Sequence, residues 1–111
     1  MDLAKEFVDV LEDKKAEKLV LLDIHAISSF TDYFIICNGT SDRMLQALAD
    51  AVLEFSKKKQ GYTPALEGNA RDGWLVVDLG DIVIHLFSPD QRDYYKLEQL
   101  WDKGSRVLSI Q

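Results

Sequence analysis

The sequence is poor in the residues on which disulfide-rich, fibrous and membrane-spanning proteins depend. Its one cysteine, Cys37, excludes an intramolecular disulfide and indicates a reducing compartment. Six glycines and two prolines in 111 residues exclude a collagen-like or low-complexity chain. No apolar run approaches the roughly 20 residues of a transmembrane helix, and the first residues carry acids where a targeting leader would be basic. We therefore expect a cytoplasmic protein without a membrane segment.

Basic residues are also few. Thirteen Lys and Arg stand against nineteen Asp and Glu, which gives a formal net charge of −6. Tight binding to bare nucleic acid depends on cationic side chains that release counterions from phosphates. The charge therefore argues against direct sequence-specific nucleic-acid binding and favours a basic protein partner. Because 47% of the residues are hydrophobic and the length is typical of one domain, residues 1–111 are expected to form a single packed domain.

Hydrophobic periodicity predicts the element order α-β-β-α-β-β-β-α. Helical spacing occurs over residues 2–11, from the capping residues 40–42 to Gly61, and up to Gly104 in a last helix that Pro89-Asp90 is expected to cap. The last of these helices has an apolar face of Tyr94, Leu97, Leu100 and Trp101. Strand patterns occur at residues 19–24, 33–38, 63–67, 74–79 and 82–87. Pro64 places the third strand at a sheet edge, and Gly80-Asp81 makes the last two strands a tight antiparallel hairpin.

This order predicts an α/β (α+β) fold. A helix lies between the second and third strands and serves as a crossover connection, so the strands are expected to form a single mixed β-sheet of about five strands flanked by helices.

Few residues in the sequence are candidates for binding a metal ion or for acting as a nucleophile. A structural zinc site needs four Cys or His ligands, mostly in local pairs, whereas this sequence offers His25, His85 and Cys37, widely separated. A Cys-His nucleophilic pair stays open, because such pairs assemble in space from distant residues. The stronger interpretation is that Cys37, inside an apolar strand, is a small buried side chain with an unactivated thiol. No metal, cofactor or catalytic residue is predicted.

The segment Asn38-Asp42 joins a predicted strand to a helix N-terminus, where backbone N–H groups can hold a phosphate. It lacks the lysine of a P-loop and the glycine spacing of a dinucleotide fingerprint. Helix capping by Thr40 or Ser41 is the stronger explanation. A nucleotide-binding or nucleotidyl-transferring protein that uses this loop is nevertheless the alternative function.

Nucleotidyl transfer would also need carboxylates that hold two metal ions, and on one strand this requires the spacing i, i+2. Asp78 and Asp81 lie three residues apart and straddle Gly80, so they are expected to face different directions. Asp81 is expected to serve the turn. The carboxylates thus argue against this enzyme class.

The hairpin is the best candidate for a binding surface. Alternation divides it into two faces, and helices are expected to cover the one that carries Leu75, Val77, Leu79, Ile82, Ile84 and Leu86. The other face then carries Trp74, Val76, Asp78, Val83, His85 and Phe87. Residues 61–90 hold one arginine and five acids, a balance of −4, and aromatic residues rimmed by acids are typical of protein interfaces. The alternative is that this face is also covered, with His85 a satisfied core histidine.

Motifs over nearly the whole chain occur together in one known family. They are the segment Thr31–Arg43, the pair Glu67-Gly68, Trp74, the segment Val77–His85, and Tyr95, Leu97, Glu98, Leu100 and Trp101 near the end. In this combination the sequence resembles the ribosomal silencing factor family, also called Iojap-like proteins. It departs mildly from the family pattern at Tyr33-Phe34 and Phe87, where aliphatic residues also occur.

The resemblance implies a fold related to nucleotidyltransferases without their catalytic acids, and hence no enzyme. It implies binding to ribosomal protein fourteen of the large ribosomal subunit and a steric block to small-subunit joining, which represses translation in starvation. Organellar relatives act in large-subunit assembly, whereas the short acidic N-terminus here points to the bacterial cytoplasmic form. The implied interface bears Trp74, Asp78, Asp81, His85 and Phe87, to which alternation adds Val76 and Val83. A homodimer of the free protein, paired through a sheet face or edge, is a further hypothesis.

Overall fold

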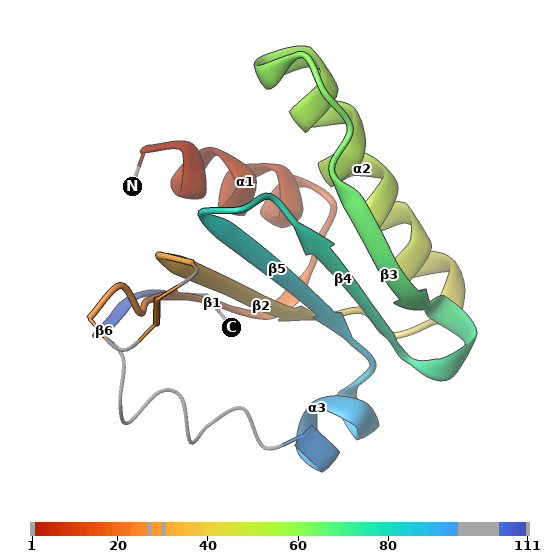
Figure 1. Ribbon diagram of the computed structural model, residues 1–111. Coiled ribbons are helices and arrows are strands. Elements are labelled where there is room, and N and C mark those ends of the chain that lie inside the picture. The colour runs from red at the N-terminus through yellow and green to blue at the C-terminus, as the bar shows by residue number, and fades with distance from the viewer. Residues whose placement is uncertain (1, 27, 30, 96–104, 111) are drawn as a thin grey trace.

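The computed structural model describes residues 2–26, 28–29, 31–95 and 105–110, in which helices pack against a six-stranded sheet (Figure 1). The helices are α1 (Asp2–Asp13), α2 (Asp42–Gln60), α3 (Pro89–Tyr95) and the short 3-10 helix η1 (Ala70–Asp72). The strands are β1 (Glu17–Asp23), β2 (Tyr33–Asn38), β3 (Ala65–Asn69), β4 (Trp74–Asp78), β5 (Ile82–Phe87) and β6 (Ser105–Ile110).

The sheet is mixed. Its strand order is β3-β4-β5-β2-β1-β6, and β2 pairs with β5 in parallel while the other neighbours pair antiparallel. The α+β fold class and the five predicted strands are confirmed, with β3 at an edge as Pro64 suggested. The structure adds β6, which lies beside β1 at the other edge. Within the last predicted helix, Leu97, Leu100, Trp101 and Gly104 lie outside the described residues.

Local side chains fix the ends of α2. The Ser41 hydroxyl accepts a hydrogen bond from the Met44 backbone N–H at 3.1 Å, which satisfies one of the free donors at the helix start. At the other end Gly61 adopts a φ of 82°, and its N–H donates to the Lys57 carbonyl. Lys57, Lys58 and Lys59 in the last turn match the negative end of the helix dipole. The predicted capping by Ser41 is confirmed.

The start of α3 differs from the prediction that Pro89-Asp90 caps it. The Ser88 hydroxyl accepts the Gln91 backbone N–H at 3.3 Å, and the Ser88 carbonyl accepts the Arg92 N–H at 3.0 Å. Ser88 is thus the capping residue, and Pro89 takes the first helical position, where its missing N–H costs nothing.

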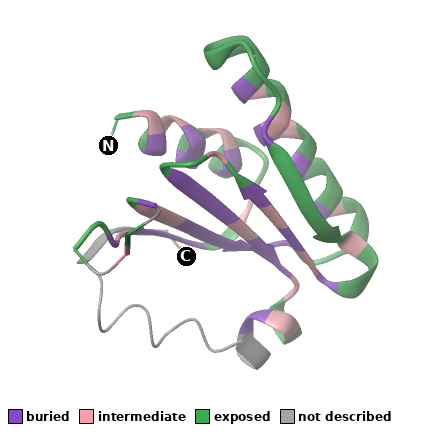
Figure 2. Cartoon of the chain, in the orientation of Figure 1, coloured by how far each residue is buried: buried purple, intermediate pink, exposed green. Residues whose placement is uncertain are grey.

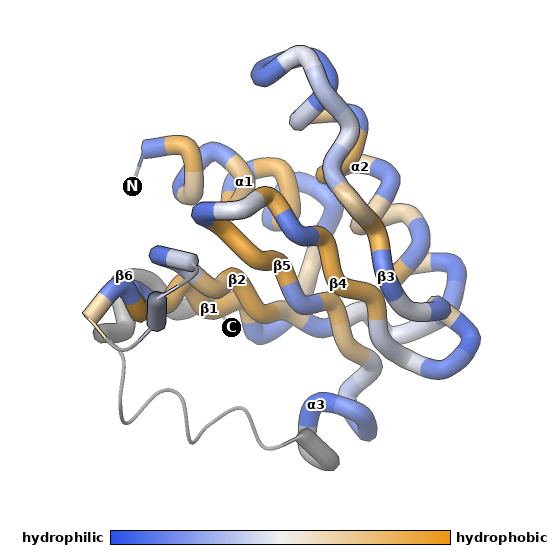
Figure 3. The backbone as a smooth tube through the Cα atoms, in the orientation of Figure 1, coloured by the Kyte–Doolittle hydropathy of each residue, from blue (hydrophilic) through white to orange (hydrophobic). Residues whose placement is uncertain are grey.

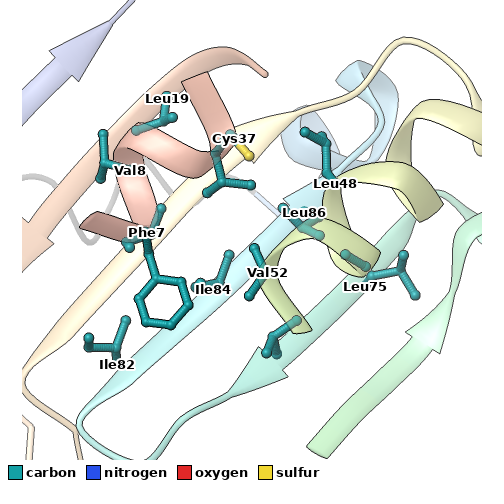
Figure 4. Close-up of a cluster of buried hydrophobic side chains, with 14 of the residues drawn as sticks. Phe7, Val8, Leu19, Cys37, Leu48, Val52, Leu75, Ile82, Ile84 and Leu86 are labelled. Atoms are coloured by element: carbon teal, nitrogen blue, oxygen red, sulfur yellow. The ribbon is translucent and has the colours of Figure 1, made fainter. Parts of the chain in front are cut away.

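The main core lies between the helices and one face of the sheet. It contains Phe7, Val8 and Leu11 of α1, Leu48 and Val52 of α2, and inward residues of the strands, including Leu19, Ile35, Cys37, Leu75, Ile84 and Leu86 (Figure 4). The apolar stretches follow the central strands, and hydrophobic and hydrophilic residues alternate along α2 (Figure 3). Both long helices therefore use their apolar faces to cover the same side of the sheet (Figure 1).

Candidate protein-binding face

Strand register places the predicted residues of the hairpin together on the sheet face opposite α1 and α2. Trp74 pairs with Phe87, Val76 with His85, and Asp78 with Val83. We call these six residues the hairpin face. The neighbouring strand β2 extends the same surface, because Phe34 pairs with Val83 and Ile36 with His85.

The hairpin face is partly buried. This arrangement lies between the two predicted alternatives, an uncovered binding surface and a fully covered core. Phe87 is 4% exposed and Val83 9% exposed, so both form its floor. Trp74, Val76 and His85 are half-buried, and Asp78 is exposed. Trp74 and Phe34 also pack against a second, smaller hydrophobic cluster of Val20, Leu22, Ile24, Ile36 and Phe87. Figure 2 shows burial changing along β4, whereas β3 beside it is exposed throughout.

His85 sits between two aromatic rings at the centre of this surface. Its ring centroid lies 4.7 Å from that of Phe34, edge to face, and 6.1 Å from that of Phe87, stacked. Burial lowers the pKa of His85 to about 4, because a charged imidazole would lose its hydration. Its Nε2 atom is buried and has no hydrogen-bond partner among the described residues. The imidazole is therefore neutral near pH 7, and it is not the satisfied core histidine of the alternative interpretation.

The acid that serves the hairpin turn is not the one that was expected. The Asp78 carboxylate accepts the Gly80 backbone N–H at 2.9 Å, and the turn closes with a 2.8 Å bond from the Leu79 N–H to the Ile82 carbonyl. Asp78, rather than Asp81, is the side chain that serves the turn, because an Asx turn needs the carboxylate two residues before the bonded N–H. The Asp81 side chain is exposed.

A third acid lies at the same end of the sheet. The Asp81 carbonyl accepts backbone N–H groups of Asp32 at 2.9 Å and Tyr33 at 3.0 Å. Asp32 is exposed, so three acidic residues, Asp32, Asp78 and Asp81, lie beside the hairpin turn. Sequence reasoning missed Asp32 because only the parallel pairing of β2 with β5 brings it there.

At the opposite end of the sheet, several polar groups of the Asn38-Asp42 loop form hydrogen bonds within the fold. An Arg92 guanidinium N–H from α3 donates to the Asn38 side-chain oxygen at 3.0 Å, and the same nitrogen donates to the Lys18 carbonyl. The Gly39 N–H donates to the Phe87 carbonyl at 2.9 Å, and Ser41 caps α2. These contacts tie the loop to β5, α3 and the first turn of α2.

The candidates for metal and nucleophile chemistry are scattered. Cys37 is fully buried in the main core, and burial raises the pKa of its thiol to about 12. His25 is exposed, and its Nδ1 lies 2.6 Å from Asp23 Oδ1. This contact raises the pKa of His25 and lowers that of Asp23. The interpretation of Cys37 as a buried, unactivated side chain is confirmed. Within the described ranges, no three His, Cys, Asp or Glu residues gather as metal ligands would.

In the part of the chain that the structure describes, no helix has the length and apolar character to cross a membrane.

The fold and its surface define a class: a small α+β domain with two long helices on one face of a mixed sheet and an aromatic, acid-rimmed surface on the other. Comparison with known proteins identifies the particular family. A family model described as "Ribosomal silencing factor during starvation" matches residues 1–111. The chain belongs to this family, as its motifs indicated.

Individual relatives agree with this assignment. A protein named ribosomal silencing factor from Halalkalibacterium halodurans is 39% identical over 106 residues, which cover 96% of this chain and 91% of that one. A mouse protein named for mitochondrial assembly of the ribosomal large subunit is 36% identical over 98 residues, or 85% of this chain and 42% of its own. A crystal structure from Chromobacterium violaceum superposes with a TM-score of 0.82 at 34% identity, covering 96% of this chain and 91% of that chain.

Proposed function

We propose that this protein silences ribosomes in the cytoplasm by docking, as one domain, on ribosomal protein fourteen of the large subunit. In this position its volume would block joining of the small subunit. The observation that carries the proposal is the hairpin face, where Trp74, Val76 and His85 keep accessible surface beside the acids of the turn. The large subunit is favoured because the mouse relative is named for assembly of that subunit.

The hairpin face offers two kinds of contact to a basic protein. Trp74, Val76 and His85 supply the half-buried apolar surface that is desolvated on binding, and Val83 and Phe87 support them from beneath. Asp78 and Asp81 are exposed at the rim, where carboxylates attract Lys or Arg and orient the partner. Occlusion needs binding alone, and so the proposal assigns no enzyme activity and no cofactor.

Replacing Trp74 tests the surface directly. Trp74→Ala is expected to weaken large-subunit binding by about 2 kcal/mol or more, roughly thirtyfold in Kd, because a central tryptophan is a typical interface anchor. Binding is measured by co-sedimentation with purified large subunits, and folding by circular dichroism. A folded Trp74→Ala protein that binds as well as wild type would overturn the assignment.

A matched control is available on the neighbouring strand. Leu66 is 38% exposed but pairs with Val77, whose side chain belongs to the helix-covered face. Leu66→Ala removes a comparable exposed hydrophobic side chain outside the hairpin face and should leave binding unchanged.

Subunit joining tests the mechanism separately from binding. Light scattering of mixed large and small subunits should show reduced association when wild-type protein is added first, and normal association with Trp74→Ala. If the protein binds large subunits and joining continues at the same rate, occlusion is wrong while docking stands.

A homodimer of the free protein is a second part of the proposal. All five residues of β3 are exposed, and no described strand pairs with its outer edge. An unpaired edge is a template for another strand, so two copies can extend one sheet through β3. Sedimentation velocity over a concentration series should show dimers that dissociate on dilution; monomers at every concentration would contradict this.

A further inference from the structure

Gly68 and Trp74 make an unusually close contact between the edge strand and its neighbour. Gly68 of β3 pairs with Leu75 of β4, one position from Trp74. A Cβ atom built on Gly68 would lie 2.6 Å from Cε3 and 2.7 Å from Cζ3 of Trp74, and 2.6 Å from the Trp74 carbonyl oxygen. The six-membered part of the indole thus rests on bare backbone, in space that any other residue would fill.

The contact distinguishes Gly68 from Gly61 and Gly80, two other glycines with positive φ. Gly68 has a φ of 94°, while Gly61 and Gly80 have φ values of 82° and 87°, and a Cβ atom at either of those two positions would meet nothing within 4 Å. Backbone conformation alone explains glycine at those two positions. At Gly68 the ring contact adds a second requirement, since an aromatic side chain packed over an edge glycine also shields that strand.

We propose that Gly68 is a positioning residue for the partner-binding surface, holding the Trp74 indole against the edge strand in the orientation that the partner protein meets. This inference rests on the proposed function. Binding immobilises side chains at an entropic cost, and a ring already held against backbone has less freedom to lose. A methyl group at residue 68 would displace the indole from this position and remove that advantage.

The test is a double-mutant cycle on large-subunit binding with Gly68→Ala, Trp74→Ala and the double variant. Gly68→Ala alone should weaken binding about tenfold. In the Trp74→Ala background it should have no further effect, because there is no indole left to misplace. The clash with the backbone carbonyl of residue 74 remains in both backgrounds. The cycle therefore measures the effect of the contact with the indole ring alone.

Gly61→Ala is the matched control, because it imposes similar backbone strain at the end of α2 without a neighbouring ring. It should lower stability and leave large-subunit binding unchanged. The indole N–H resonances in a two-dimensional NMR spectrum provide an independent readout. The Trp74 signal, assigned by its loss in Trp74→Phe, should shift in Gly68→Ala and stay in place in Gly61→Ala.

The outcomes separate the two proposals. If Trp74→Ala binds normally, the proposed function itself fails. If Trp74→Ala loses binding and Gly68→Ala does not, or if Gly68→Ala weakens both backgrounds equally, the positioning role is wrong and the docking surface stands. Should Gly68→Ala unfold, thermal unfolding of the double variant decides: smaller destabilisation in the Trp74→Ala background supports the ring contact, and equal destabilisation refutes it.

Discussion

Consecutive residues of β5 belong to two different environments. Ile84 and Leu86 are fully buried beneath the helices, whereas His85 between them points to the opposite face and remains half-buried. The same alternation runs through β4, where Leu75 and Val77 enter the main core while Trp74 and Val76 keep accessible surface. One face of the sheet therefore packs in the main core, and the other retains large, partly accessible side chains, which we propose bind the partner.

Truncation on the helix-covered face should produce the largest effect. Leu86→Ala removes a fully buried side chain from the main core and is expected to cost about 3 kcal/mol of unfolding free energy, since the cavity cannot fully collapse. Val76→Ala on the hairpin face should cost less than about 1 kcal/mol, because its side chain is half-buried. Urea denaturation measures both, and equal losses would remove the distinction between the faces.

Much of the fold could be predicted because local patterns and tertiary packing agree. The alternation of the hairpin, its Gly80 turn and the helical spacing of α2 each specify an element without knowledge of its neighbours. The strand Ser105–Ile110 was not predicted because Ser105, Arg106 and Ser109 interrupt its apolar residues and it follows a glycine that suggested a helix end. Its pairing with β1 is a long-range contact for which a single sequence carries no signal.

For the candidate site, the alternation of residues along the strands predicted which side chains share a face, and no more than that. Alternation assigns Trp74, Val76 and His85 to one face. It does not show how deeply each side chain is buried, so the burial of Val83 and Phe87 appears only in the structure. Asp32 joins the acidic end through parallel pairing, and Gly68 supports Trp74 through an antiparallel pairing across strands. Both contacts depend on which strands pair in the sheet. The secondary-structure propensities of single residues do not determine that pairing.

The two histidines lie in different environments, and the stability of the fold should therefore depend on the pH through each of them in a different way. Burial holds the pKa of His85 near 4, below its unfolded value of 6.5. Between these values the unfolded state binds more protons, so stability contributed by neutral His85 is complete above pH 6.5 and declines as the pH falls toward 4. The shift corresponds to at most about 3 kcal/mol.

His85→Gln should flatten the dependence of unfolding free energy on pH in this window, as measured by urea denaturation at several pH values. Exposed His25 provides the contrast. Its pKa is raised by Asp23, so its contribution is present at low pH and disappears as the pH rises through the raised value. His25→Gln should therefore leave the acidic decline in place, and an equal flattening in both variants would show that His85 is not the buried group responsible.

Charge at the rim should have the smallest effect, because exposed carboxylates act on a partner at a distance and are screened by salt. Asp81→Asn is expected to lower the association rate with large subunits about fivefold at low ionic strength, with little change in dissociation. Asp9→Asn on the exposed surface of α1, which covers the other face of the sheet, removes the same charge and serves as control. Surface plasmon resonance at two salt concentrations measures both. If the two variants slow association equally, net charge attracts the partner; if Asp81→Asn alone does so and salt abolishes the difference, the acidic end of the hairpin directs docking.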